Sequence, residues 1–392
     1  MPTDATFLLA GLFIALGAIV YVYKMYTDRD RDLPTQINAD YLRGLNLVLS
    51  RRTDEALELF VQMAKVDDDT LETHFALGHL FRRRGEMERA IRVHENLLAR
   101  PNLNEAQRHQ ALFSLAEDYL GAGLFDRAEQ LFGQLRDSTT LAEAALEKLV
   151  SIYEREQEWQ KAIEALRKLE ILRGSKSSQV AHYYCELAEI ARAAGDRALA
   201  REHLRNTVRS ESGALRGTLI RATLAREDQD YAQAIPLYEQ VIAADRHFTS
   251  EVLPPLLECY RAADRLAEFD AYVENLIAKE PAAYRDLAYG AIIGDMRGSK
   301  ALEGAVERFV FEQPVLANLV NAAELRALPA AERGAAIQRI AGSLRSIAMA
   351  SARYRCSNCG YSTQRFIWHC PSCKLWETVR PIQSVPLENV LA

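Results

Sequence analysis

Apolar and polar residues alternate along most of this chain with the period of amphipathic helices, and the helical pattern itself repeats. Six alanines in these patterns are separated by 34, 38, 34, 38 and 34 residues. A period of 34 is that of the tetratricopeptide repeat, in which each unit is a pair of helices. The pattern therefore predicts six stacked helix pairs. The marker alanines are Ala56, Ala90, Ala128, Ala162, Ala200 and Ala234.

Two further positions recur in register with these alanines, a mostly small residue twelve places earlier and a mostly large residue four places later. The small residues allow the two helices of a unit to pack closely, and the large ones fill the space between neighbouring units. The small set is Gly44, Gly78, Ala116, Val150, Ala188 and Ala222, and the large set is Phe60, His94, Phe132, Leu166, Leu204 and Tyr238. We expect a superhelix whose concave face, lined by first helices, docks a peptide or helix.

Glycine marks the turn inside several units. Gly85, Gly123 and Gly195 stand where a first helix should end, and glycine favours the left-handed backbone found at such ends. Beyond residue 250 the pattern weakens, and divergent helix pairs are predicted at 256–272 and 284–309. These features place the repeat array at 37–312.

A last helical stretch, from Val315 to Ala350, is broken at Leu328 and Pro329. We expect residues 313–350 to cap the array and to link it to the C-terminal segment of the chain.

The first apolar run differs from the others because no charge interrupts it. Residues 5–23, nineteen in all, would span about 28 Å as a helix, close to the thickness of the hydrocarbon core. Asp4 stands where a cleaved signal peptide carries basic residues, and no small-residue cleavage site follows, so an uncleaved anchor is predicted. The anchor is placed at 1–26 and a juxtamembrane linker at 27–36.

The charges beside this run predict its orientation. Lys24, Arg29 and Arg31 follow the run, whereas no basic side chain precedes it. The positive-inside rule then leaves the large C-terminal part in the cytoplasm.

Four of the six cysteines form two C-x-x-C pairs with ten residues between them, namely Cys356, Cys359, Cys370 and Cys373. Two such knuckles can place four thiolates around one ion, and both zinc and iron accept that set. A closed four-thiolate shell favours a structural or electron-transfer site over a catalytic one. Two disulfides are the alternative, which a reducing cytoplasm disfavours. A metal module is predicted at 351–381, with a tail at 382–392.

The predicted module is basic and rich in aromatic residues, although the whole chain carries a net charge of -6, which argues against a general nucleic-acid binder. Residues 351–380 contain five basic residues and one glutamate, so their formal net charge is +4. The net charge is about +2 when a divalent ion and four thiolates are included. A fold this small needs its ion for stability, and its aromatics should form its core or contact a neighbouring surface. These aromatics are Tyr354, Tyr361, Phe366, Trp368 and Trp376.

Nothing in the array is typical of an active site. Its histidines are scattered singly over different units, so no catalytic residue and no site for an organic cofactor is predicted. The run Arg82 to Arg84 is expected to form a solvated helix face.

The order of anchor, array and cysteine module resembles the lipopolysaccharide assembly protein B family over nearly the whole chain. The resemblance is carried by residues 354–361 and 368–373 of the module and by two segments of the array, 77–86 and 181–188. It implies a non-enzymatic adaptor in the inner membrane of a Gram-negative bacterium. The same resemblance implies that the four cysteines ligate metal in a rubredoxin-like module and are needed for function.

Members of that family help a membrane-bound AAA+ protease to degrade the deacetylase that commits precursor to lipid A, and an inner-membrane sensor protein opposes them. The expected fold is therefore all-α, a tetratricopeptide superhelix with a transmembrane helix and a four-cysteine ribbon. Two other functions stay open at this point: an iron-containing rubredoxin-type electron-transfer protein, and a zinc ribbon that binds nucleic acid. The knuckles lie closer together than in ordinary rubredoxin, which weakens the electron-transfer hypothesis. The choice between zinc and iron and the question of homo-oligomerisation also stay open.

Overall fold

A computed structural model of the chain describes residues 39–66, 71–207 and 214–382. They fall into two compact units that divide between Leu149 and Val150. The predicted membrane anchor at 1–26 and its linker at 27–36 lie outside the described residues. Within the described ranges, no helix is both long and apolar enough to cross a membrane.

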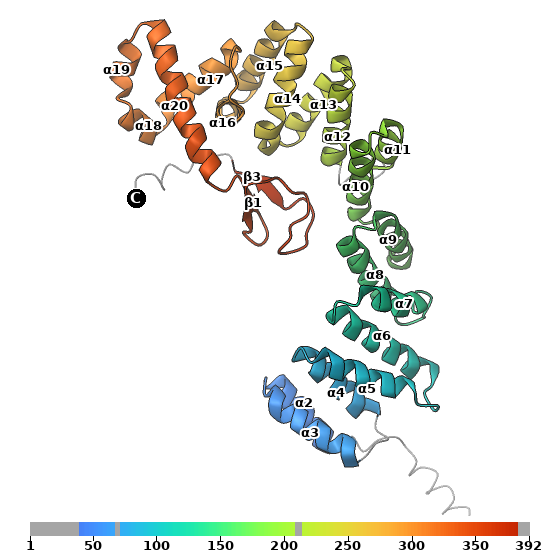
Figure 1. The fold of residues 1–392 in the computed structure, drawn as a ribbon. Coiled ribbons are helices and arrows are strands. Elements are labelled where there is room, and N and C mark those ends of the chain that lie inside the picture. Colours follow the sequence, from blue (N-terminus) through green and yellow to red (C-terminus); the bar gives the residue numbers. More distant parts are fainter. Residues whose placement is uncertain (1–38, 67–70, 208–213, 383–392) are drawn as a thin grey trace, which may run out of the picture. The chain divides into compact units, whose positions relative to one another are not determined.

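The described residues of the first unit form helices that pack as neighbouring pairs (Figure 1). Helices α4 and α5 form one hairpin and α6 and α7 the next, and α8 contains the division between the units. The helices are α2 (Ala39–Leu49), α3 (Thr53–Val66), α4 (Leu71–Arg83), α5 (Met87–Leu98), α6 (Glu105–Gly121), α7 (Phe125–Gln134) and α8 (Ala142–Glu156).

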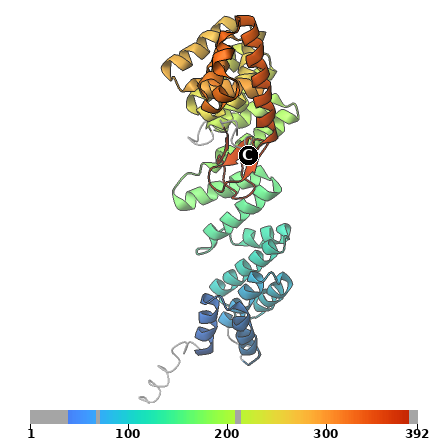
Figure 2. The same ribbon diagram turned by 90° about the vertical axis from the view of Figure 1, so that its left-hand side faces the viewer.

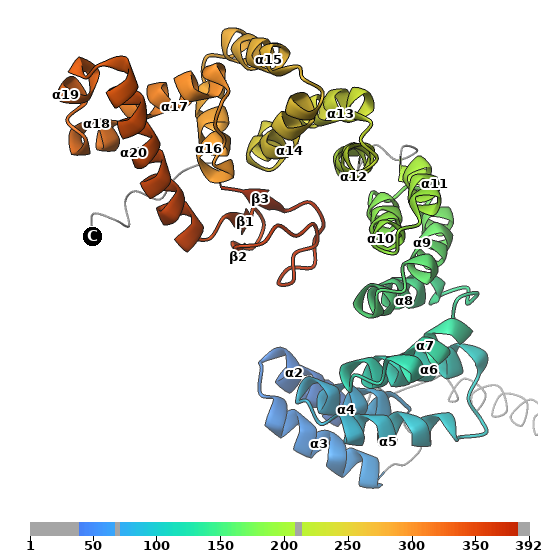
Figure 3. The ribbon, with the colours of Figure 1, turned by 45° about the horizontal axis from the view of Figure 1, so that its top comes forward.

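The second unit continues the helix pairs and ends in a cap and a small sheet. Helix α20 packs against α16 and α17 in the cap (Figure 3). The helices are α9 (Trp159–Arg173), α10 (Gln179–Ala193), α11 (Arg197–Thr207), α12 (Ala214–Glu227), α13 (Tyr231–Ala244), the 3₁₀ turn η1 (Arg246–Phe248), α14 (Thr249–Ala262), α15 (Leu266–Lys279), α16 (Ala283–Gly294), α17 (Lys300–Glu312), α18 (Pro314–Leu319), α19 (Ala322–Ala327) and α20 (Ala330–Ala350).

The periodic residues lie where the repeat requires them. All six marker alanines are fully buried, and the small and large residues in register with them are buried as well. In α2 and α4 the small residue is a glycine that lies directly against the large residue of its own unit, Gly44 against Phe60 and Gly78 against His94. The all-α tetratricopeptide class is confirmed.

The turns inside the units share one backbone conformation. Gly85, Gly123 and Gly195 all have φ near +80°, and the amide after each glycine donates to a carbonyl of the first helix, as Glu86 does to Phe81. This is the helix ending expected for C-terminal glycine. Units without a glycine use the same conformation, and their left-handed residues are Arg51, Gln157, Gln229 and Asp264.

The divergent part keeps the paired arrangement. The pair predicted at 256–272 corresponds to α14 and α15, and the pair at 284–309 to α16 and α17, with Gly298 at φ +86° between them. Three helices follow, and Pro329 directly precedes the longest of them, α20. The exact domain boundaries stay a prediction.

The basic run in α4 departs from its expected role. Arg82 is largely buried and forms ion pairs with Glu117 at 2.8 Å and Asp118 at 2.7 Å. Asp118 is fully buried and also contacts His94 Nδ1 at 2.5 Å. The prediction of a solvated face is therefore wrong for Arg82, which links α4 to α6, although Arg83 is exposed.

Candidate metal centre and the surface that holds it

The cysteines lie on a three-stranded antiparallel sheet that follows α20. Its strands are β1 (Tyr354–Cys356), β2 (Ser362–Thr363) and β3 (Val379–Pro381), in the order β2-β1-β3. Tyr354 pairs with Thr363 on one side and with Pro381 on the other. Two views at right angles both show this sheet beside helices of the second unit (Figures 1 and 2).

The two knuckles have the same backbone geometry. In the first, the amide of Cys356 donates to the carbonyl of Tyr361 at 2.7 Å, and Gly360 donates back to Cys356 at 3.0 Å. In the second, Cys370 and Lys374 make the equivalent bonds, at 3.0 and 2.9 Å. Gly360 and Lys374 both have left-handed backbones, at φ +76° and +59°. The sequence indicated the first of these turns through its glycine, whereas lysine gave no such signal for the second.

The four thiol groups converge on one point. All four sulfurs lie within 4.8 Å of one another, Cys356 and Cys373 at 3.7 Å and Cys359 and Cys370 at 3.6 Å. Sulfurs at the corners of a tetrahedron around an ion are about 3.8 Å apart when each bond is about 2.3 Å long. The donor set and its spacing thus fit one ion, and zinc and iron fit equally well. Assignment of these four residues as ligands stays a prediction.

The environment of the thiols differs from one to the next. Hydrogen bonding by the Thr378 side chain lowers the pKa of the Cys356 thiol to about 6, helped by backbone amides of its own knuckle. Burial raises the pKa of the Cys370 thiol to about 11. Since a metal binds the thiolate, an ion must displace the proton of Cys370 in particular, and its binding releases protons.

The sheet and knuckles, residues 353–381, which we call the ribbon, pack on helices of their own unit through Trp376. The indole stacks on His182 of α10 with ring centres 4.9 Å apart and planes 12° from parallel. His369 also stacks on the indole, with ring centres 4.6 Å apart. Trp159 and Tyr183 meet it edge to face, at 6.2 and 5.9 Å. Offset and edge-on aromatic contacts of this kind stabilise a fixed orientation.

One carboxylate ties this aromatic cluster to α8. Glu154 Oε1 accepts from Trp376 Nε1 at 3.1 Å and from the Tyr183 hydroxyl at 2.7 Å. Burial, and then the charge of Glu154, raise the pKa of Tyr183 well above its usual value, so the phenol stays a donor.

A buried arginine lies between the two tryptophans of the ribbon. Arg216 of α12 is 4% exposed, and its guanidinium lies 5.6 Å from the ring centre of Trp368 and 5.8 Å from that of Trp376. It also donates to Glu186 at 2.8 Å. A guanidinium over an aromatic face is favourable, and the carboxylate balances its charge.

A second contact region lies around η1. Phe248, itself buried, stacks on Trp368 at 5.4 Å and meets Phe366 edge-on at 5.5 Å. Ion pairs flank these rings, Arg353 with Glu251 at 2.9 Å and Arg380 with Asp245. The ribbon is therefore fixed to the array along two regions of the same unit.

Burial sets the charge state of the histidine in this contact. Desolvation, and then the nearby Arg216 guanidinium, lower the pKa of His182 to about 3. The imidazole is therefore neutral at pH 7 and stacks as an uncharged ring. Its Nε2 lies 3.5 Å from Glu377.

The aromatic residues of the ribbon divide between core and contact as the sequence suggested. Tyr354 is buried within the ribbon, whereas Phe366, Trp368 and Trp376 contact the helices, and Tyr361 is 38% exposed. Sequence reasoning missed their partners in the helices, His182 and Arg216 among them. One signal pointed to His182: residues 181–188 were among the segments that resemble the family.

Comparison with known families assigns both parts of the chain. Residues 354–381 match the rubredoxin metal binding domain. Residues 73–106, 113–176 and 185–247 match tetratricopeptide repeats. Among solved structures, a chain of the Naa15/Naa10 complex bound to HypK-THB is similar with a TM-score of 0.46 and 18% identity, covering 68% of this chain and 40% of that one, too weak a similarity to support an argument.

Full-length relatives extend the match across both units. Lipopolysaccharide assembly protein B of Escherichia coli strain K12 is 34% identical over 385 residues, covering 95% of this chain and 98% of the relative. The protein of the same name from Haemophilus influenzae is 29% identical over 398 residues, covering 97% and 98%. Identity at this level over nearly both full lengths, with the repeats and the four-cysteine ribbon in the same chain, shows that this protein belongs to the lipopolysaccharide assembly protein B family.

Proposed function

We propose that this protein is a non-enzymatic adaptor in lipopolysaccharide synthesis, anchored in the inner membrane with its bulk in the cytoplasm. In this proposal it brings a membrane-bound AAA+ protease to the deacetylase of the lipid A pathway, and an inner-membrane sensor protein opposes it. The observation that carries the proposal is the family match, which covers 95% of the chain and includes both array and ribbon.

The docked ribbon supports a role in protein contacts. Helix pairs of this class offer surfaces for peptides and helices. The ribbon is held on the array by buried aromatic stacking and by Arg216. An ion that keeps the ribbon folded would therefore also keep the shape of the surface that array and ribbon form together.

Anchoring gives the adaptor a physical advantage. When adaptor, protease and deacetylase are confined to one membrane surface, the second binding event becomes effectively intramolecular. Weak individual contacts then suffice for productive delivery.

The test is co-purification from membranes together with the half-life of the deacetylase in cells. The intact chain should retain protease and deacetylase, and a Cys370→Ser, Cys373→Ser variant should lose them and lengthen the deacetylase half-life. Ser372→Ala is the matched control, because Ser372 is exposed between the two cysteines of the same knuckle. Failure of the intact chain to retain either protein would reject the proposal.

The same purified protein tests the electron-transfer alternative, which the sulfur distances do not distinguish from a structural site. Iron in four thiolates would give a red-brown protein whose visible absorption is bleached by reductant. A colourless protein with one zinc per chain would exclude it.

A further inference from the structure

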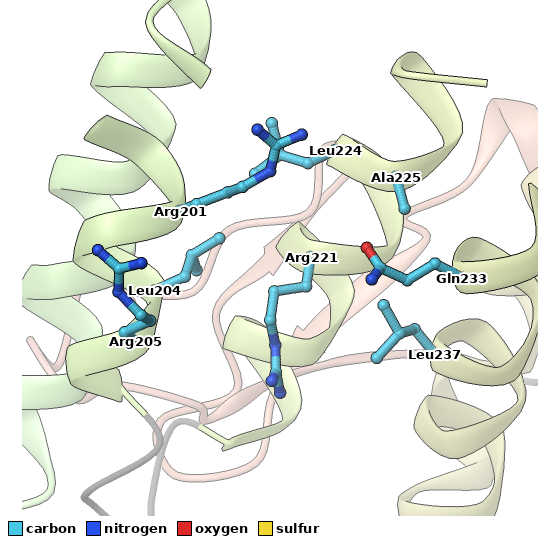
Figure 4. Close-up of a pocket in the computed structure, with 8 residues that line it drawn as sticks. All are labelled: Arg201, Leu204, Arg205, Arg221, Leu224, Ala225, Gln233 and Leu237. Atoms are coloured by element: carbon cyan, nitrogen blue, oxygen red, sulfur yellow. The ribbon is translucent and has the colours of Figure 1, made fainter. Parts of the chain in front are cut away.

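A cavity of about 340 Å³ opens between three consecutive helices of the second unit, and the residues that line it differ from those described above in contact with the ribbon. Its walls come from α11 and α13, with α12 between them (Figure 4). This volume lies at the lower end of the range of ligand-binding pockets, about 300–1,000 Å³.

The cavity has an apolar floor and a basic rim. Leu204 and Leu224 are buried in the floor, and Leu237 closes it from α13. Three arginines line the same space, Arg201, Arg205 and Arg221. Among the described residues that line it, none is acidic.

The arginines are held in different ways. Arg221 Nη2 donates to the Thr218 hydroxyl at 2.9 Å, a bond that fixes its side chain along α12. Arg201 pairs with Asp228, which also pairs with Arg197 and does not line the cavity. Arg205 is exposed at the rim.

The arrangement of these residues indicates the kind of ligand. Arg205 of α11 and Arg221 of α12 line the same cavity as Leu204 and Leu224, so two cationic side chains from neighbouring helices border an apolar surface. Two separate charges beside an apolar surface fit a ligand with separated anionic groups and an apolar group better than a single phosphate. A helix with acidic residues three or four positions apart around a leucine or phenylalanine presents carboxylates on either side of an apolar side chain.

We propose that this cavity binds an acidic amphipathic helix of a partner protein, with a large apolar side chain on the leucine floor and carboxylates on Arg205 and Arg221. The inference rests on the proposed adaptor function only in assigning the helix to a partner. Because the arginines are partly exposed, each charge should change the affinity by only a few-fold, and the charges together should also raise the rate of association.

The test uses the full chain in detergent and a displayed library of 14-residue peptides. Enriched peptides should carry acidic residues three or four positions apart around leucine or phenylalanine. Their fluorescein-labelled forms, measured by anisotropy, should bind about tenfold or more weakly to an Arg205→Gln, Arg221→Gln variant, and more weakly at high salt. An Arg339→Gln, Arg365→Gln variant, which makes the same charge change at exposed positions elsewhere in the unit, should bind normally.

Three results would overturn the inference. The selection could give only basic or uncharged peptides, the two variants could bind equally, or vesicles containing phosphatidylglycerol could bind through Arg205 and Arg221 while no peptide does. Unchanged far-UV circular dichroism confirms that the variants are folded. If the Arg205→Gln, Arg221→Gln variant loses peptide binding but supports normal deacetylase turnover, the cavity is not used by the adaptor and the adaptor proposal stands. If the intact chain binds the peptides but recovers neither protease nor deacetylase, the adaptor proposal fails and the cavity proposal stands.

Discussion

Close contact between a glycine and one large side chain determines how the helices of a unit pack. A Cβ atom at Gly78 would lie 2.4 Å from His94, and one at Gly44 would lie 2.5 Å from Phe60. Later units have alanine or valine at this position, so whether a side chain larger than glycine fits depends on the large residue that it meets in its own unit. His94 has little freedom to move, because it is fully buried and its Nδ1 contacts Asp118.

Gly78→Ala should therefore destabilise the first unit by about 1–3 kcal/mol, the usual cost of overpacking. Urea denaturation measures the free energy of unfolding. Gly133→Ala is the control, because a Cβ there meets nothing within 4 Å in α7. That change should be neutral or stabilise by up to about 1 kcal/mol, since alanine is the better helix former. Equal destabilisation by both changes would show that the close contact does not matter.

Backbone strain at the turns inside the units predicts that a change to glycine, at a left-handed residue, stabilises the protein. Gln229 has φ +61° and an exposed side chain, and a left-handed backbone costs a residue other than glycine about 1–2 kcal/mol. Gln229→Gly should raise the free energy of unfolding by about 0.5–1 kcal/mol after the extra entropy of the unfolded chain is counted.

Gln240→Gly provides the comparison for that change, because Gln240 is also exposed but lies inside α13. It should destabilise by about 1 kcal/mol. A loss of stability in both variants would contradict the argument from backbone strain.

At the level of elements, the ribbon is both the candidate metal site and an element docked on helices of its own unit. All three tryptophans of the chain lie in or against its contact with the helices: Trp376 and Trp368 come from the ribbon, and Trp159 meets Trp376 edge-on. Intrinsic fluorescence therefore reports on this contact, whereas far-UV circular dichroism reports mainly on the helices.

Removal of metal should separate these two signals. Chelation is expected to unfold the ribbon, because its small core, with Tyr354 and Val379, cannot replace the free energy contributed by the ion. Tryptophan emission should shift to the red while the helical circular dichroism changes by only a few per cent. Loss of the helical signal in parallel would mean that the array depends on the ion, and no change in either signal would mean that the ribbon folds without it.

The elements differ in how far the sequence alone predicted them. The repeat and the four cysteines follow from spacing within short stretches, so both were visible as patterns. The docking surface was not, because Trp376 lies more than 190 residues from His182 and 222 from Glu154, and no local rule pairs such distant positions. The left-handed turn residues without glycine, such as Gln157, were missed because their side chains give no sign of that conformation.

At the scale of the whole molecule, burial of His182 links ribbon docking to pH. Its pKa is about 3 in the folded protein and about 6.5 when exposed, so the unfolded or undocked state binds the proton more readily. A histidine with a lowered folded pKa contributes stability that is complete above pH 6.5 and is lost as pH falls towards 3. The groups that face it are Glu377, Arg216 and the ring of His369.

Between pH 7.5 and 5.5 this histidine alone should lower the free energy of unfolding by about 1.4 kcal/mol. The measurement is urea denaturation followed by tryptophan emission, compared between the intact chain and His182→Phe, which keeps an aromatic ring against Trp376 but cannot titrate. Other groups that titrate in this range, such as His79, whose pKa burial also lowers, are present in both proteins and cancel in the difference. If His182→Phe shows the same loss of stability on acidification as the intact chain, protonation of His182 does not limit docking, and the pH sensitivity comes from other groups.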